Sequence, residues 1–209
     1  MSILAHGLRA AAGNTGGGGG PIEYISSNYR NATSSDNVTV TAPSGIEDGD
    51  LLVAYGYTRD SSTGTPSCSG FTLHADNDYS FVMSKIASSE SGDYTFNWTS
   101  TAFNVSISLS VYRNASNIAV GSFETPATSN TSTAPSMTAT AGGIIAYFGM
   151  DGTKSTSSTI TDYTRRVTTS GSSSQASYDN LSVPSGSTGD LSITWNSSAV
   201  NTAIQVNIY

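Results

Sequence analysis

The chain has 209 residues, with eight Lys and Arg against fifteen Asp and Glu, so its formal net charge is -7. Ser and Thr are abundant, only 11% of the residues are charged, and hydrophobic residues make up 36%. This acidic balance excludes the basic face that phosphate backbones require, so nucleic acid is not an expected partner. No membrane contact is expected either, because no run approaches the roughly 20 apolar residues of a spanning helix.

The first 20 residues differ in kind from the rest. Residues 1–12 are mildly apolar, and residues 13–20 form a glycine-rich tether that ends before Pro21. His6, Gly7 and Arg9 interrupt the apolar run, which is unlike a secretory signal. We expect residues 1–20 to be an extended arm that docks on another protein; a disordered leader is the alternative. The residues expected to make the docking contacts are Ile3, Leu4, His6, Leu8 and Arg9.

Short runs of alternating or apolar residues follow, separated by turn residues, which is typical of antiparallel strands. No segment shows a helical period of useful length. In the first half of the chain the expected strands are Ile22 to Ser26, Asn37 to Thr41, Leu51 to Thr58, Phe71 to His74, Tyr79 to Lys85, Tyr94 to Trp98 and Val105 to Tyr112.

The second half of the chain repeats the first. Residues 92–100, GDYTFNWTS, return as residues 189–197, GDLSITWNS, and the same spacing continues to Tyr112 and Tyr209. Upstream, residues 51–56 align with residues 144–149. A unit copied with its turn and its alternation is expected to fold around its own core. The alignment places Trp98 and Trp195 at the same point of each unit, where we expect both to be core anchors.

These patterns predict an all-β chain. We expect two tandem antiparallel β-sandwich units, of an immunoglobulin-like or jelly-roll-like kind, produced by internal duplication. The arm would occupy residues 1–20, the first unit residues 21–115 and the second residues 116–209.

Residues with catalytic chemistry are sparse. The two histidines, His6 and His74, lie far apart in the sequence, and Cys68 has no cationic neighbour in its loop. Two carboxylate clusters, at 47–50 and 76–78, have the residue types of a calcium site or a glycosidase pair. Neither cluster recurs in the second unit, so we interpret both as solvated turns. The sequence predicts no enzyme activity, no metal and no cofactor.

Several stretches resemble a known family. Residues 42–55, 69–73 and 87–98, together with the opening residues 1–11, look like proteins that tailed bacteriophages encode, often among their virion structural genes. The resemblance implies a non-enzymatic virion component whose arm docks on other virion proteins of the capsid or tail. It also implies a homo-oligomer, such as a trimer. Because the sequence lacks a coiled coil or a long repetitive shaft, a head decoration or head-fibre protein is favoured over a tail fibre.

Two loops, Tyr55 to Gly70 and Thr153 to Ser174, are candidates for weak binding of host glycans, since Tyr stacks on sugar faces and the loop amides and hydroxyls form hydrogen bonds with them. Inert spacers are the alternative. A free carbohydrate-binding module or adhesin is the rival function, and it predicts paired exposed aromatic residues in both units. Tyr57 and Tyr79 have no aromatic partners in the second unit, so this hypothesis ranks lower.

Overall fold

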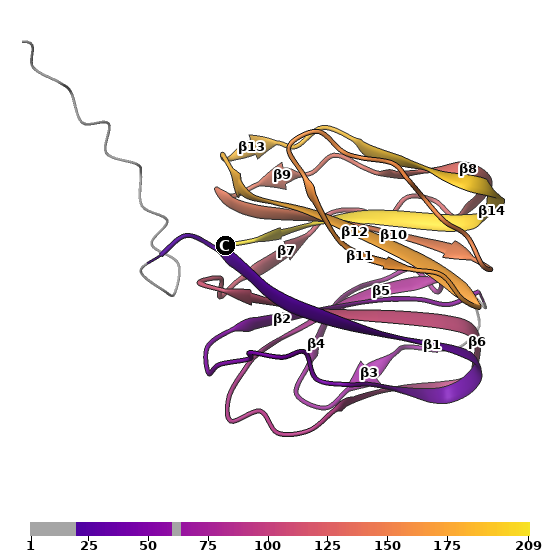
Figure 1. Ribbon diagram of the computed structural model, residues 1–209, viewed down its shortest axis with the longest axis horizontal. Helices are drawn as coiled ribbons and strands as arrows, with labels where there is room; N and C mark the ends of the chain where they lie inside the picture. The colour runs from indigo at the N-terminus through magenta and orange to yellow at the C-terminus, as the bar shows by residue number, and fades with distance from the viewer. Residues whose placement is uncertain (1–19, 60–63) are drawn as a thin grey trace, which may run out of the picture.

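The computed structural model describes residues 20–59 and 64–209. Strands make up 64% of the described residues, most of them in two antiparallel sheets of six strands each, and the described ranges contain no helix. The prediction of an all-β chain with tandem antiparallel sandwich units is therefore confirmed. Figure 1 shows the two sheets stacked face to face.

The first sheet takes its strands from the first half of the chain. Their order is β1-β6-β2-β5-β4, and β3 pairs with β6 at one end. The strands are β1 (Glu23–Val40), β2 (Leu51–Tyr57), β3 (Ser67–Cys68), β4 (Thr72–Asp76), β5 (Ser80–Ile86) and β6 (Tyr94–Arg113).

The second sheet repeats this order with the strands of the second half. Its order is β7-β14-β10-β12-β11, with β8 also paired to β14, and β9 and β13 form a separate two-stranded ribbon. The strands are β7 (Ile118–Val120), β8 (Ala127–Ala134), β9 (Thr138–Ala139), β10 (Gly142–Asp151), β11 (Thr164–Thr169), β12 (Ser173–Val183), β13 (Gly186–Ser187) and β14 (Leu191–Ile208).

Two long strands correct the expected pattern of short ones. The sequence predicted separate strands at 22–26 and 37–41 and at 94–98 and 105–112, but β1 and β6 each run through the gap. They pair with each other from Glu23 opposite Arg113 to Val40 opposite Tyr94. Their register shifts between Ser35 and Asn37, and β8 and β14 show the same kind of shift between Thr194 and Ala199. Each long pair bends there, so that its two halves cover opposite sides of one core.

Three apolar cores result. The first core, inside the first unit, contains Leu52, Phe96, Trp98 and Ile107. The second core, inside the second unit, contains Ile144, Phe148, Tyr178 and Trp195. A central core between the sheets joins the two units, and the sequence did not reveal it. Its members are Ile22, Leu51, Val53, Tyr55, Tyr57, Val82, Tyr112, Ala115, Ile145, Tyr147, Ile204, Val206 and Ile208.

The duplication extends to single hydrogen bonds. In the first unit the Asp93 carboxylate accepts from the Ala42 amide at 3.1 Å, and in the second the Asp190 carboxylate accepts from the Ser136 amide at 2.8 Å. The preceding residues, Gly92 and Gly189, both have positive φ, as the predicted Gly-Asp turns require. The same turn therefore closes the same strand in both units.

The structural alignment of β2 with β10 differs by one residue from the sequence alignment. Sequence similarity matches Leu51 with Ile144, but Leu51 faces the central core and Ile144 faces the second core. Because strand side chains alternate between the two faces of a sheet, a shift of one residue moves every side chain to the opposite face. In the structure Tyr55 matches Tyr147, and the two rings stack on each other at 4.8 Å with 13° between their planes. An approximate two-fold axis passes through this stack.

A local irregularity in β6 breaks the symmetry of the two units. Asn104 has a φ of 51°, and Ala102 and Val105, three positions apart, both face the first core. The alternation therefore shifts by one residue at Asn104, and Ile107 faces the first core. In β14 the alternation is uninterrupted, so the aligned residue Ile204 faces the central core instead. After Asn104 the structural match of β6 with β14 therefore differs by one residue from the sequence alignment, and Tyr112 corresponds to Ile208.

Asn104 tests this irregularity. Replacing it by Val should lower the free energy of unfolding by about 1–2 kcal/mol more than replacing it by Gly, because a β-branched side chain clashes with the backbone at positive φ. Both variants lose the 3.2 Å hydrogen bond from Asn104 to Asp151, so their difference isolates the backbone effect. Denaturant unfolding of both proteins measures it, and equal stabilities would contradict the assignment.

Candidate functional site

The described chain begins and ends at one end of the molecule. The Asn114 side chain donates to the Pro21 carbonyl at 2.9 Å, and the amides of Ser116 and Asn117 donate to the Tyr209 carbonyl at 3.0 and 2.8 Å. Figure 1 shows the C-terminus beside the start of β1. The docking residues predicted in the arm, Ile3, Leu4, His6, Leu8 and Arg9, lie outside the described residues. The arm therefore joins the sandwiches at this end, which we call the base.

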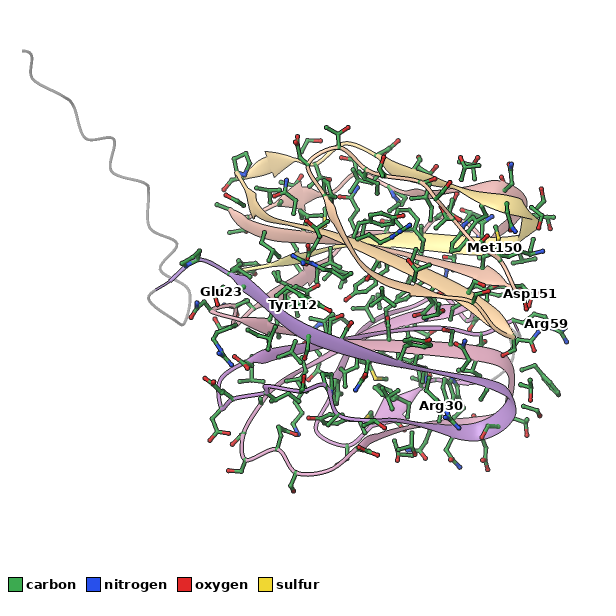
Figure 2. All side chains as sticks on the ribbon, in the orientation of Figure 1. Glu23, Arg30, Arg59, Tyr112, Met150 and Asp151 are labelled. Carbon is green, nitrogen blue, oxygen red and sulfur yellow. The ribbon has the colours of Figure 1, made fainter. Side chains whose placement is uncertain are left out.

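The opposite end, which we call the tip, carries the turns of both units. Figure 2 shows Arg59, Met150 and Asp151 together at the tip, far from Glu23 at the base. Arg59 follows β2 and Asp151 ends β10, the strands that match each other across the two-fold axis. Both units thus point the same way, because the matching strands β2 and β10 both run from base to tip.

The two tryptophans lie inside the units. Trp98 is 7% exposed and packs against Phe81 with ring centroids 6.0 Å apart. Trp195 is 2% exposed, and its indole N–H donates to the Ser132 hydroxyl at 2.8 Å. Neither ring is presented to a ligand.

The carboxylate cluster at 47–50 was predicted to be a solvated turn, and this prediction is wrong for one of its residues, Asp50. Asp50 is only 2% exposed, and it forms a two-pronged ion pair with Arg113 at 3.0 Å for each contact. It also accepts from the Glu47 amide at 2.8 Å. A buried carboxylate held this way positions the loop before β2 and contributes no open coordination position.

The second cluster, at 76–78, forms a local turn. The Asp76 carboxylate accepts from the Asp78 amide at 3.0 Å, and burial raises the pKa of Asp76 above its usual value. Asn77 reaches across to the second unit and donates to the Thr202 hydroxyl at 3.1 Å. Within residues 20–59 and 64–209, no three His, Cys, Asp or Glu side chains gather as a metal site would need.

The candidate glycan loops hold three tyrosines in their described parts, and two of them are buried. Tyr55 and Tyr57 are fully buried, and Tyr57 donates to the Val200 carbonyl at 2.9 Å across the unit interface. Tyr163, in the second loop, packs partly buried against the second core. Tyr55 and Tyr57 therefore have no ring face open to a sugar, and Tyr163 has part of its ring exposed.

A polar cluster at the base joins the units and was not predicted. Arg166 pairs with both oxygens of the buried Asp179 at 2.8 and 2.9 Å, and its guanidinium lies 4.3 Å from the centre of the Tyr24 ring. Tyr24 in turn meets Tyr112 edge to face at 5.8 Å. Burial raises the pKa of Asp179, and Arg166 opposes that shift. The Arg-Arg pair in the sequence gave no sign of which side chain turns inward.

A cavity of about 280 Å³ opens on the other side of the base. It lies between the β4–β5 edge of the first sheet and the linker that enters β7. His74 lines it, with its Nε2 atom 2.7 Å from the Ser84 hydroxyl oxygen, and burial lowers the pKa of His74. The residues that line the cavity are Leu51, Gly70, Thr72, His74, Ser84, Lys85, Ile86, Ser116, Asn117 and Ile118.

Comparisons of the chain with protein families, with curated proteins and with solved structures give no match. Over its described residues, the protein has no helix that is long and apolar enough to cross a membrane. The arrangement of this chain's own residues therefore carries the argument that follows.

Cys68 provides a test of the first core. The thiol is buried and forms no disulfide, and burial raises its pKa to about 11. Since the thiolate is the reactive form, we expect the folded protein at pH 8 to react with a chromogenic disulfide reagent at least tenfold more slowly than the chain unfolded in guanidinium. Rapid stoichiometric reaction of the folded protein would show that the β3 region opens readily.

Proposed function

We propose that the protein is a non-enzymatic structural component of a tailed-bacteriophage virion, a decoration or fibre protein of the head. Residues 1–20 anchor it to the particle, and the two units project from the surface. The observation that carries this proposal is the polarity of the fold. The chain leaves the arm at the base, and the turns of both units lie at the tip.

The central core makes one anchor sufficient for both units. Ile22 is 7% exposed and belongs to that core, so the chain just after the tether is held between the sheets. Tension on the arm would act on the joined pair rather than on the first unit alone. Many copies on one particle would compensate for modest affinity of each arm.

The charged residues described above have structural partners. Arg113 holds Asp50, Arg166 holds Asp179, and Lys85 pairs with Glu90 at 2.7 Å. These pairs fix loops and sheet edges, as a display protein requires. The resemblance of residues 42–55 and 87–98 to phage proteins supplies the virion as the location.

The arrangement also fits a base that rests on a tail, and the absence of a coiled coil in the sequence is the reason to favour the head. A homo-oligomer, such as a trimer, is part of the same proposal. A free carbohydrate-binding module or adhesin ranks lower, because Tyr55 and Tyr57 are buried and Tyr163 is only partly exposed.

Co-assembly tests the anchor. Particles that lack this protein are mixed with the full chain, with residues 21–209, or with a full-length Ile3→Ser, Leu4→Ser, Leu8→Ser variant, and bound protein is measured by sedimentation. We expect only the full chain with its natural arm to bind, since each apolar side chain of the arm that becomes buried contributes up to roughly 1.5–3 kcal/mol to binding.

Image reconstruction of the decorated particles would then show whether the base rests on head or tail. Binding of residues 21–209 as tight as that of the full chain would overturn the anchoring role. Absence of binding by every form would overturn the virion proposal itself. Thermal unfolding of each form, which should be alike, controls for loss of fold.

A further inference from the structure

The two units carry the same bulge at the same sheet edge. In β4 and β5, Leu73 lies opposite Met83 and Ala75 lies opposite Val82, so His74 is the extra residue. In β11 and β12, Arg165 lies opposite Tyr178 and Val167 lies opposite Ser177, so Arg166 is the extra residue. His74 therefore occupies the position of Arg166.

The neighbours of these bulges match as well. Ser84 lies opposite Thr72 and Asp179 lies opposite Thr164, so Ser84 occupies the position of Asp179. The hydrogen bond between His74 and Ser84 at 2.7 Å replaces the ion pair between Arg166 and Asp179 at 2.8 Å.

A third position differs in size. Tyr24 lies opposite Tyr112 in β6, and Ile118 lies opposite Ile208 in β14. Tyr112 and Ile208 are the last residues of the two strands that face the central core. Ile118 and Tyr24 therefore occupy matching positions: Tyr24 of the first unit covers Arg166 of the second, and Ile118 of the second unit lies on the corresponding side of the first.

These three differences explain the cavity. On the side of the second unit, an aromatic ring, a guanidinium and a carboxylate fill the space between the sheets, with the ring 4.3 Å from the guanidinium. On the side of the first unit, an isoleucine, an imidazole and a hydroxyl stand in their places, and about 280 Å³ is left open beside them.

We propose that this cavity is a binding site for a phenolic ring, which lies over the His74 imidazole as the Tyr24 ring lies over Arg166. Leu51 and Ile118 offer apolar contact to the ring, and the hydroxyls of Ser84 and Ser116 offer hydrogen-bonding partners for the phenol oxygen. Ile86, which also lines the cavity, is 43% exposed and offers further apolar surface for the ring to cover.

The electrostatics suit a neutral ring. Burial lowers the pKa of His74, so the imidazole is neutral at pH 7 and stacks without a charge to desolvate. The one cation in the lining, Lys85, is already paired with Glu90 at 2.7 Å. Two sources share this chemistry, a tyrosine side chain of a partner protein and a free small phenol. The site stands independently of the proposed virion role.

Titration of the full-length protein with p-cresol tests the site. The probe is followed through the His74 imidazole protons by NMR, with a His6→Gln variant to assign them. We expect a saturable shift of the His74 signals and contacts between the p-cresol ring protons and the Ile118 methyls. Cyclohexylmethanol, which is similar in size but not planar, is expected to give no shift at the same concentrations.

A matched pair of variants exchanges the two sides of the base. In Ile118→Tyr the new tyrosine ring should fill the cavity, so p-cresol binding should weaken at least tenfold. Tyr24→Ile should open a second site over Arg166, which p-cresol then fills. N-acetyl-tyrosinamide separates the two sources. Binding of both probes supports a partner's tyrosine, and binding of p-cresol alone supports a free phenol.

The proposal is overturned if neither probe shifts His74, if cyclohexylmethanol binds as well as p-cresol, or if folded Ile118→Tyr binds as tightly as the natural chain. Should Ile118→Tyr fail to fold, the contacts between p-cresol and Ile118 in the natural chain decide the question, and their absence overturns the site. Because the assay uses purified protein without particles, its outcome is separate from that of the co-assembly experiment.

Discussion

The stack of Tyr55 on Tyr147 is the contact around which the two units are arranged. The rings lie 4.8 Å apart on the approximate two-fold axis, inside a core that neither unit could bury alone. Exposing that apolar face would be unfavourable in water, so the sheets have to cover each other. With β2 and β10 fixed opposite each other, β1 lies beside β11 at one edge and β4 beside β7 at the other. The position of the base, the polar cluster at Tyr24 and the cavity at His74 all follow from this pairing.

The two copies satisfy that constraint by different means. The shift at Asn104 lets β6 turn Ile107 and Leu109 into the first core and present a buried serine stripe, which includes Ser106 and Ser108, to the interface. The second unit holds the irregular residue in place, because Ser173 donates to the Asn104 carbonyl.

β14 has no such shift and turns its apolar residues to the interface instead. Its inward side then carries Gln205 and Asn207, whose amides donate to backbone carbonyls at 2.7 to 3.0 Å, those of Ala134, Thr140, Gly143 and Gly189. One unit is thus closed by apolar packing and the other partly by side-chain amides, although their sequences align throughout these strands.

The sequence predicted what depends on local patterns. Alternating runs, Gly-Asp turns and the repeated tryptophan segment indicated an all-β chain with two similar halves, and the structure has both. It did not predict which face each strand turns to which core, because one residue at positive φ, Asn104, reverses the faces of everything after it. The burial of Asp50 was missed for a related reason, since its partner Arg113 is distant in the sequence and carries no local signal. The cavity at His74 could be recognised only by comparing the two units in space, where Ile118 stands in for Tyr24.

The shared direction of the two units has a consequence for how the tip can vary. Because β2 and β10 both run from base to tip, each chain presents two ends side by side, and the connections that follow these strands have diverged in length and composition. In a duplicated scaffold with unlike ends, one loop can change in sequence while the other loop, and the fold beneath both, remains as it was.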